Sequence, residues 1–351
     1  MASKLRWGII STGKIAVQFA EGLQQVRDAS LVAVGSRSQD TADEFGARFS
    51  IPHRYGSYED LANDPDVDIV YIGTPHSHHY DNTMMCLKAG KHVLCEKAFT
   101  VNARQAAQVI ALARKKNLFL MDAVWSRCLP AYDELRSILA RGTLGDVRMV
   151  TVDFGFHFPV NPRDRLWDPN LAGGALLDIG IYAVQMASLV YGAEPKTVAT
   201  QAAFGETGVD EQAGVVLGYE GGKLAVFSIS FQSETTQEAN VMGRSGRVKI
   251  NRQFWHPDSL VLTLQGKADR LIKRPYKGNG YNYEAIEVMK CIRAGKTESA
   301  LMPLDETMGI MRTLDAIRAK WGFKYPMEKK AAPAKKAAPA RRAASPRRSR
   351  A

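Results

Sequence analysis

The chain has 351 residues, of which 45% are hydrophobic and 24% charged, so it is long enough for two domains and has an ordinary globular composition. Its net charge of +11 is uneven, because residues 328–351 carry nine Lys and Arg against one Glu, or +8, which leaves +3 elsewhere. The positive charge therefore belongs to a tail and argues against a nucleic-acid-binding fold in the body of the chain.

The cysteines and the apolar segments of the sequence indicate in which cellular compartment the protein is expected. The four cysteines form no C-x-x-C pair, which is typical of a reducing compartment and argues against a disulfide framework or a zinc site. Residues 1–6 lack the apolar stretch of a signal peptide. The long apolar segment 171–193 contains Asp178 and Gln185, which favours a buried helix over a membrane span. We therefore expect a cytoplasmic protein.

A strand and a turn at the start of the chain indicate a dinucleotide site. Residues 5–10 form an apolar run, and apolar residues recur at helical spacing after the turn. Backbone N–H groups of such a turn and the positive end of the helix both point at an anion. The fingerprint G-x-G-x-x-G/A appears as Ser11-x-Gly13-x-x-Ala16, with one glycine replaced. We expect the following residues to bind the cofactor: Ser11, Thr12, Gly13, Lys14 and Ile15.

A Walker A loop is the rival interpretation of these residues, since Gly8 and Gly13-Lys14 have its spacing. The next residue is Ile15, which cannot ligate Mg²⁺, and Gly8 falls inside the strand. The sequence therefore excludes a P-loop.

The end of the second expected strand, residues 31–35, indicates which cofactor is used. An NAD enzyme places Asp or Glu there to bind the ribose hydroxyls. This chain has Ser36-Arg37-Ser38, whose guanidinium and hydroxyls suit a 2′-phosphate. An arginine at a solvated helix start is the alternative. We expect NADP rather than NAD.

Further strand and helix patterns alternate up to residue 122. The expected strands are 67–73, 91–95 and 118–122, and the expected helices are 39–49, 78–89 and 103–116. Such repeated βα units predict a doubly wound parallel sheet with helices on both faces. We assign residues 1–125 to this Rossmann domain.

Two loops follow strands at the same edge of this sheet. Thr74-Pro75 and His78 come after one strand, where we expect them to flank the cofactor. Three histidines are bunched there without an i, i+4 pair, which disfavours a metal site. Glu96-Lys97 follows the next strand; such a pair is commonly a surface ion pair, but at this edge the lysine lies near the nicotinamide.

The second part of the chain, residues 126–327, has a different pattern. Short strands that alternate apolar with polar residues are expected at 147–158, 197–204, 214–219, 223–231, 240–250 and 260–264. Helices are expected at 132–140, 176–191, 282–294 and 304–320. The pattern predicts an α+β domain on a large, mostly antiparallel open sheet. Its uncovered face favours a homodimer.

Asp178 and Tyr182 lie one helical turn apart in an apolar helix that follows Gly173-Gly174. A buried carboxylate and phenol need partners, so a purely structural hydrogen-bonding pair is the alternative to a catalytic one.

The tail, residues 328–351, repeats basic pairs with Ala and Pro every six residues, which predicts disorder. Without aromatic residues it cannot read bases, so it is either a sequence-blind polyanion contact or a solubility arm.

In order along the chain, Ser11–Ala16, Thr74-Pro75, Glu96-Lys97 and Asp178-x-x-x-Tyr182 resemble the motifs of the glucose–fructose oxidoreductase/inositol dehydrogenase (Gfo/Idh/MocA) family. Within it, the chain is most similar to the dimeric dihydrodiol dehydrogenases and NADP-dependent D-xylose dehydrogenases. The family's Glu-Lys-Pro is Glu96-Lys97-Ala98 here. The resemblance implies that Lys97, Tyr182 and Asp178 lie at the hydride-transfer site, and that Trp125, Arg127 and His157 line the substrate pocket.

These expectations describe an NADP(H)-dependent oxidoreductase acting on a sugar, polyol, diol or related carbonyl compound. Tyr182 is the expected proton donor or acceptor, with its pKa lowered from about 10 by the Lys97 cation. Asp178 is expected to bind substrate by orienting its hydroxyl, or to orient Lys97. The alternative is a non-catalytic NADP-binding sensor on the same fold.

Overall fold

The computed structural model describes residues 4–329 and places six parallel strands in the first sheet. Their order, β3-β2-β1-β4-β5-β6, is the doubly wound arrangement expected from repeated βα units. The strands are β1 (Leu5–Ile10), β2 (Ala29–Gly35), β3 (His53–Tyr55), β4 (Ile69–Ile72), β5 (His92–Glu96) and β6 (Leu120–Ala123).

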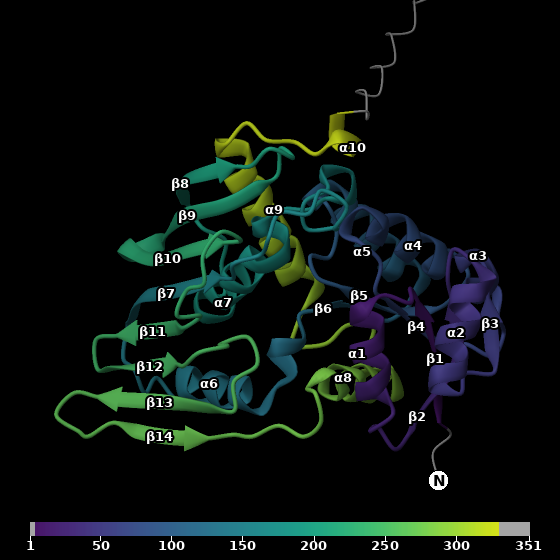
Figure 1. The fold of residues 1–351 in the computed structure, drawn as a ribbon. Helices are drawn as coiled ribbons and strands as arrows, with labels where there is room; N and C mark the ends of the chain where they lie inside the picture. Colours follow the sequence, from purple (N-terminus) through teal and green to yellow (C-terminus); the bar gives the residue numbers. More distant parts are fainter. Residues whose placement is uncertain (1–3, 330–351) are drawn as a thin grey trace, which may run out of the picture.

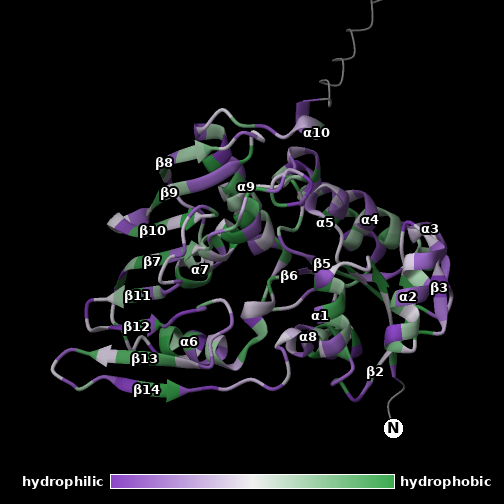
Figure 2. Cartoon of the chain, viewed as in Figure 1, coloured by the Kyte–Doolittle hydropathy of each residue, from purple (hydrophilic) through white to green (hydrophobic). Residues whose placement is uncertain are grey.

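Helices cover both faces of this sheet (Figure 1). They are α1 (Lys14–Leu23), α2 (Gln39–Phe49), α3 (Tyr58–Asn63), α4 (His76–Lys88) and α5 (Ala103–Lys116). The rings of Phe19 in α1 and Tyr71 in β4 stack with centroids 3.7 Å apart, which joins helix and sheet in one core. The bounds of α2 and α5 agree with the prediction. The prediction missed β3 and α3, because both are short and mostly hydrophilic (Figure 2).

The second sheet has eight strands in the order β14-β13-β12-β11-β7-β10-β9-β8. Only β7 and β10 pair in parallel, and the other neighbours are antiparallel, as predicted. The strands are β7 (Val147–Gly155), β8 (Thr197–Phe204), β9 (Asp210–Tyr219), β10 (Lys223–Ser230), β11 (Ala239–Gly243), β12 (Gly246–Ile250), β13 (Ser259–Leu264) and β14 (Arg270–Lys273). The single strand expected at 240–250 is in fact the hairpin β11–β12.

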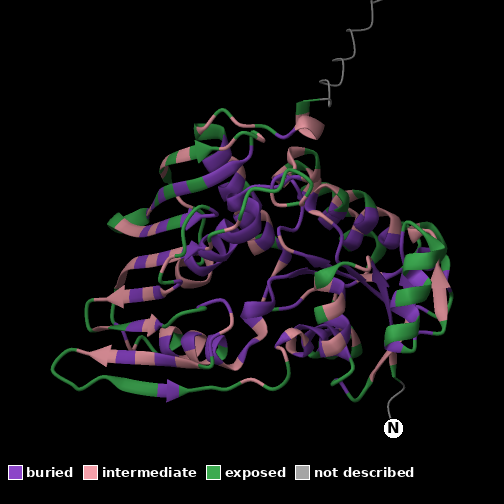
Figure 3. Ribbon diagram, in the orientation of Figure 1, coloured by how far each residue is buried: buried purple, intermediate pink, exposed green. Residues whose placement is uncertain are grey.

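The helices of the second part pack on one face of this sheet or return to the first domain. They are α6 (Pro130–Ala140), α7 (Ile181–Tyr191), α8 (Tyr281–Arg293), α9 (Leu304–Lys320) and α10 (Pro326–Lys329). The edge strands β8 and β14 are mostly exposed (Figure 3). Along β9, buried and exposed residues alternate, and Val216 is exposed on the outer face. A homodimer across that face stays a prediction.

The last helices join the two domains. α8 lies beside α1 (Figure 1), where Asn279 Nδ2 donates to the Gln18 carbonyl at 2.7 Å. α9 lies against α5, where the Ala103 N–H donates to Asp315 at 2.9 Å. Residues assigned to the second domain therefore also help to build the cleft between the domains.

The segment Pro169–Tyr191 is the one part of residues 4–329 that is long and apolar enough to cross a membrane. Within its most apolar window, 83% is buried inside the protein. This agrees with the expected buried helix.

The fold extends two residues further than predicted. Glu328, assigned to the tail, accepts from Arg318 Nη1 at 2.6 Å, the Tyr325 N–H at 2.9 Å and Asn102 Nδ2 at 2.9 Å. The start of the tail at 328 is therefore wrong, because this carboxylate neutralises a buried arginine. The rest of the predicted tail, 330–351, lies outside the described residues.

We expect deletion of residues 330–351 to leave the melting temperature unchanged and to abolish salt-sensitive retention on a polyanion column. Deletion of residues 328–351 should instead lower stability by about 3 kcal/mol, because Arg318, only 3% exposed, loses Glu328 and keeps only Asp315 as a carboxylate partner. Thermal unfolding and column elution check both results. A lower melting temperature for the shorter deletion would show that the tail packs on the fold.

Candidate active site

A cavity of about 540 Å³ lies at the carboxyl ends of β1, β4 and β5, facing α7. Ligands of doubly wound sheets bind at this edge. The cavity brings together these predicted residues: Ser11, Gly13, Lys14, Ile15, Thr74, Pro75, Glu96, Lys97, Asp178 and Tyr182.

The turn after β1 keeps the shape of a glycine turn although its first glycine is replaced. Ser11 has a φ of 117°, in the region that favours glycine. Its Oγ accepts from the Gly13 N–H at 3.1 Å, which holds the turn in place before α1 begins at Lys14. The turn and the helix start face the cavity, so the backbone geometry suits a pyrophosphate.

The residues expected at the 2′-phosphate lie beside this turn, outside the cavity. The Ser11 N–H donates to the Gly35 carbonyl at 3.0 Å, and Thr12 Oγ1 lies 3.5 Å from Ser36 Oγ. Ser38 caps α2 by accepting from the Thr41 N–H. Arg37 is exposed between these two hydroxyls, with its charge available to an anion.

Lys97 connects the two domains across the cavity. Its Nζ donates to the Asp178 carbonyl at 2.7 Å and lies 3.9 Å from Asp178 Oδ1 and 4.8 Å from the centre of the Tyr182 ring. Burial lowers the pKa of Lys97, while the charges of Asp178 and Glu96 raise it. The Lys97–Ala98 peptide bond is cis.

Tyr182 differs from the expectation in its electrostatics. Its hydroxyl accepts from Trp125 Nε1 at 2.8 Å. Burial, and then the charge of Glu96, raise the pKa of Tyr182 well above its ordinary value. The expectation that Lys97 lowers this pKa is therefore wrong for the unliganded protein, because the ammonium lies over the ring and the phenol is desolvated.

Asp178 lies in a π-helical turn, Leu176–Gly180, that leads directly into α7. Such turns are frequent at functional sites. Asp210 at the start of β9 anchors it, since its Oδ2 accepts from the Leu176 N–H at 2.6 Å. Gly174 has a φ of 114°, and a Cβ there would lie 2.3 Å from Asp210 Oδ1. The paired glycines thus let the chain turn tightly against Asp210.

Sequence reasoning missed several residues that line the cavity. They are Gln18, Gly73, Phe158, Asp164, Arg165, Leu166 and Tyr281. Arg165 Nη1 donates to Asp178 Oδ1 at 2.8 Å. Although burial alone raises the pKa of Asp178, Arg165 and then Lys97 hold it below its ordinary range. The loop of Arg165 shows no periodicity, so no sequence signal pointed to it.

The histidines of the loop after β4 have separate roles. The predicted residue, His78, is exposed and does not line the cavity, because it points outward from α4. His76 lines it instead: its Nδ1 lies 2.9 Å from the Ala172 carbonyl, and burial lowers its pKa to about 3. The ring is therefore neutral, with Nε2 left as an acceptor. His79 is buried between the carbonyls of Thr74 and Ala98.

The residues expected to line the substrate pocket lie elsewhere. Trp125 stacks on Tyr281 at 4.5 Å behind the cavity wall. Arg127 is buried and donates to Gln185 and Glu306 at 2.7 Å, because an enclosed guanidinium needs neutralising partners. His157 is exposed and contacts the Gln232 carbonyl, and its neighbour Phe158 lines the cavity. Trp125, Arg127 and His157 therefore do not line this cavity, and their contact with a substrate stays a prediction.

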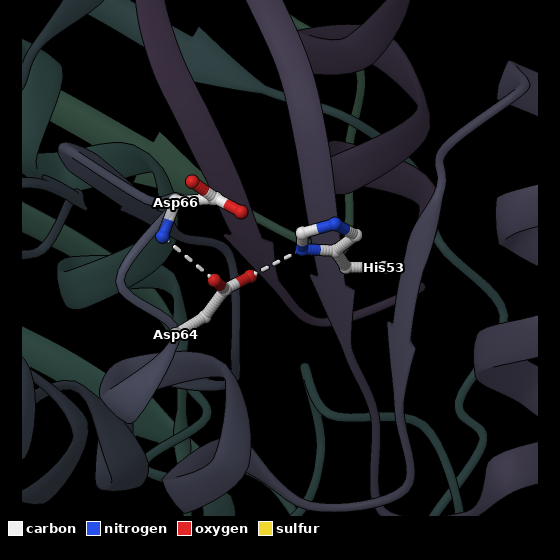
Figure 4. A group of neighbouring side chains, drawn as sticks. All are labelled: His53, Asp64 and Asp66. Carbon is white, nitrogen blue, oxygen red and sulfur yellow. Dashed lines mark hydrogen bonds and ion pairs between the residues drawn. The ribbon is translucent and has the colours of Figure 1, made fainter.

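A separate cluster of His53, Asp64 and Asp66 has side chains close enough to hold a metal ion (Figure 4). His53 Nδ1 lies 2.7 Å from Asp64 Oδ2, and Arg6 Nη1 contacts Asp66 at 2.7 Å. These contacts account for the cluster as a link between β1, β3 and the loop before β4.

Two protein-family models match the chain. Residues 5–123 match the Gfo/Idh/MocA oxidoreductase family, NAD-binding Rossmann fold, and residues 132–249 match the Gfo/Idh/MocA C-terminal domain. Proteins of Mus musculus and Homo sapiens named trans-1,2-dihydrobenzene-1,2-diol dehydrogenase are 40% and 41% identical over 337 residues. Each alignment covers 93% of this chain and 99% of the relative.

Two solved structures share the arrangement of both domains. A 3-ketoreductase from Actinomadura kijaniata, in complex with NADP and TDP-benzene, has a TM-score of 0.82 at 25% identity and covers 90% of this chain and 98% of its own. An aldose-aldose oxidoreductase from Caulobacter crescentus, complexed with glycerol, has a TM-score of 0.83 at 27% identity. The match covers 91% of this chain and 98% of that structure's chain. The expected fold class is confirmed.

Proposed function

Because the chain belongs to the Gfo/Idh/MocA oxidoreductase family, we propose that it is an NADP(H)-dependent dehydrogenase of diols, polyols or sugars. The observation that carries this proposal is that Lys97, Asp178 and Tyr182 line the same cavity as the turn after β1. The intact Lys97 and Tyr182 support an enzyme over a non-catalytic sensor.

Tyr182 is the proposed acid and base. Its oxygen already accepts from Trp125, so its own O–H is free to donate to a substrate carbonyl. The raised pKa keeps the phenol protonated, which suits a proton donor in the reductive direction. That donation leaves Tyr182 as a phenolate, and in the oxidative direction it is this phenolate that takes the proton from the substrate hydroxyl.

Lys97 is proposed to hold the reacting oxygen and to stabilise negative charge as it develops there. Its Nζ is anchored by the Asp178 carbonyl and lies over the Tyr182 ring, so it is positioned before substrate arrives. Because Lys97 is largely buried, its charge acts in a medium of low dielectric constant, where electrostatic stabilisation is stronger than in water.

The described residues fit the dinucleotide. The turn at Ser11 and the start of α1 would hold the pyrophosphate, and Ser36, Arg37 and Ser38 would hold the 2′-phosphate of NADP. The cofactor, when bound, supplies or accepts the hydride.

The names of the relatives support the substrate class. Two act, by name, on a trans-1,2-dihydrobenzene-1,2-diol, and the solved structures belong to a 3-ketoreductase and an aldose-aldose oxidoreductase. The cavity combines Phe158 and Tyr281 with charged residues, which suits a hydroxylated ring. The test is a panel of aldoses, polyols and diols with NADP⁺ and NAD⁺, followed by reduced-cofactor absorbance. No oxidation of any member with either cofactor would contradict the proposal.

We expect Arg37→Asp to weaken NADP binding and to shift the preference towards NAD. A hydrogen bond to a charged group contributes about 1.5–3 kcal/mol, so the dissociation constant for NADP⁺ should rise at least about tenfold. Arg27→Asp, an equal charge change on an exposed residue before β2, is the control. Binding titrations with both cofactors measure the effect. Equal affinity of the parent protein for NADP⁺ and NAD⁺ would refute the proposed preference.

A further inference from the structure

One wall of the cavity comes from the loop between β7 and the π-helical turn. Its lining residues are Phe158, Asp164, Arg165 and Leu166. Neither the comparisons nor the proposed acid–base chemistry gives this loop a role. Within it, Arg165 makes an ion pair with Asp178, a residue of the reaction site.

The two oxygens of Asp178 have different surroundings. Oδ1 accepts from Arg165 Nη1 at 2.8 Å and lies 3.9 Å from Lys97 Nζ. For Oδ2, the described residues provide no hydrogen-bond partner, and this oxygen is not enclosed away from solvent. The side chain as a whole is 12% exposed, and it lines the cavity. Oδ2 is therefore the acceptor that remains for a ligand.

An ionised carboxylate can only accept hydrogen bonds. A ligand group that satisfies Oδ2 must therefore be a donor, such as a hydroxyl. Tyr182 lies four residues further along and lines the same cavity. Lys97 Nζ lies 3.9 Å from Asp178 Oδ1 and 4.8 Å from the centre of the Tyr182 ring, so both side chains face one small region, which suits two oxygens on neighbouring carbons of one substrate.

We propose that Arg165 is a specificity-determining positioning residue, which holds Asp178 so that Oδ2 accepts from a hydroxyl on the carbon next to the reacting one. This inference rests on the proposed function. Arg165, on the loop after β7, would thus make the enzyme prefer substrates that carry a hydroxyl on the neighbouring carbon.

A structural role and a positioning role for Arg165 predict different results. The Arg165 side chain is 49% exposed but its partner Asp178 is only 12% exposed, so loss of the ion pair can lower stability in either case. A merely structural ion pair would act on all substrates alike and would leave the preference between them unchanged. A positioning role instead changes the preference between substrates that differ in one hydroxyl.

The test compares trans-cyclohexane-1,2-diol with cyclohexanol, which lacks the neighbouring hydroxyl. The full chain, Arg165→Met, Arg165→Lys and Arg163→Met are assayed with NADP⁺ for kcat and KM. Arg163 is exposed on the same loop and does not line the cavity, so it is the matched control. A site built to bond a hydroxyl rejects an analogue without it, so we expect the parent to prefer the diol by at least about 100-fold in kcat/KM.

Arg165→Met should lower kcat/KM for the diol about 30-fold and for cyclohexanol less than about threefold, because only the diol uses Asp178 Oδ2. Arg165→Lys should restore part of the preference, and Arg163→Met should match the parent. Adding Arg165→Met to Asp178→Asn should lower kcat/KM for the diol little further, because both changes remove the same interaction with the substrate hydroxyl.

Other outcomes contradict the inference. If kcat/KM in Arg165→Met fell equally for the diol and for cyclohexanol, or if the preference for the diol were unchanged, Arg165 would not determine substrate specificity. A parent that oxidises both substrates equally well would overturn the inference while leaving the proposed function intact. A parent that binds neither cofactor and oxidises no member of the panel would overturn the proposed function and the inference with it.

Discussion

Lys97→Met is expected to lower turnover at least about a hundredfold, the usual scale for groups that assist proton transfer. Methionine keeps much of the apolar stem but removes the ammonium that contacts the Asp178 carbonyl and faces Tyr182. The turn proposed to bind the pyrophosphate lies between β1 and α1, away from Lys97 in the chain, so NADP binding should stay mostly intact. Single-turnover kinetics and a cofactor titration measure the two properties separately.

Tyr182→Phe is expected to lower turnover by the same factor as Lys97→Met. The ring remains under Lys97, but the oxygen that would carry the proton is removed. Tyr191→Phe is the matched control, because it removes a hydroxyl from the same helix, where that hydroxyl donates to the Leu224 carbonyl. Turnover within a few-fold of the parent in both Lys97→Met and Tyr182→Phe would show that the chemistry lies elsewhere.

The parts of the site that sequence predicted are those with a local structural rule. A strand followed by a turn and a helix has a fixed geometry, so Ser11 and Gly13 could be placed at the cavity. Lys97 follows a parallel strand, and the carboxyl ends of such strands meet at one edge. Asp178 and Tyr182 share a helical face, although the structure reaches this through a π-helical turn.

The residues that sequence reasoning expected at the substrate pocket, and that do not line the cavity, are positioned by contacts between distant segments. Arg127 looked available for substrate, but its charge is neutralised by Glu306, 179 positions later in the chain. His157 and Phe158 are neighbours, and only the packing of their loop decides which of them lines the cavity. Arg165 is the converse case, since nothing local to it predicts an ion pair with Asp178.

The paired glycines before Asp178 were a clear signal whose cause lies in another segment. Asp210, at the start of β9, is fully buried, and burial raises its pKa to about 7, whereas the Leu176 N–H lowers it. Its carboxyl group fills the space beside Gly174 and holds the first N–H of the π-helical turn. The position of Asp178 and Tyr182 therefore depends on a contact that no motif in their own segment reveals.

Gly174→Ala is expected to destabilise the protein by about 3 kcal/mol or more and to lower turnover. An L-residue at a φ of 114° costs about 1–3 kcal/mol. The new Cβ would also lie 2.3 Å from Asp210 Oδ1, so the carboxyl group must move and release the Leu176 N–H, at a further cost of about 1–3 kcal/mol. Urea unfolding measures the first effect and steady-state kinetics the second.

Gly192→Ala separates the two contributions to this loss. Gly192 ends α7 with a φ of 61°, and among residues 4–329 no atom outside its own turn of chain lies within 4 Å of the position of an added Cβ. Alanine there meets only the backbone penalty of the left-handed region, about 1–2 kcal/mol, and leaves Asp178 and Tyr182 in place. The Gly174 variant should therefore lose clearly more stability than the Gly192 variant, and it alone should lose turnover. Equal losses in both would show that Asp210 moves freely, and that the turn does not depend on it.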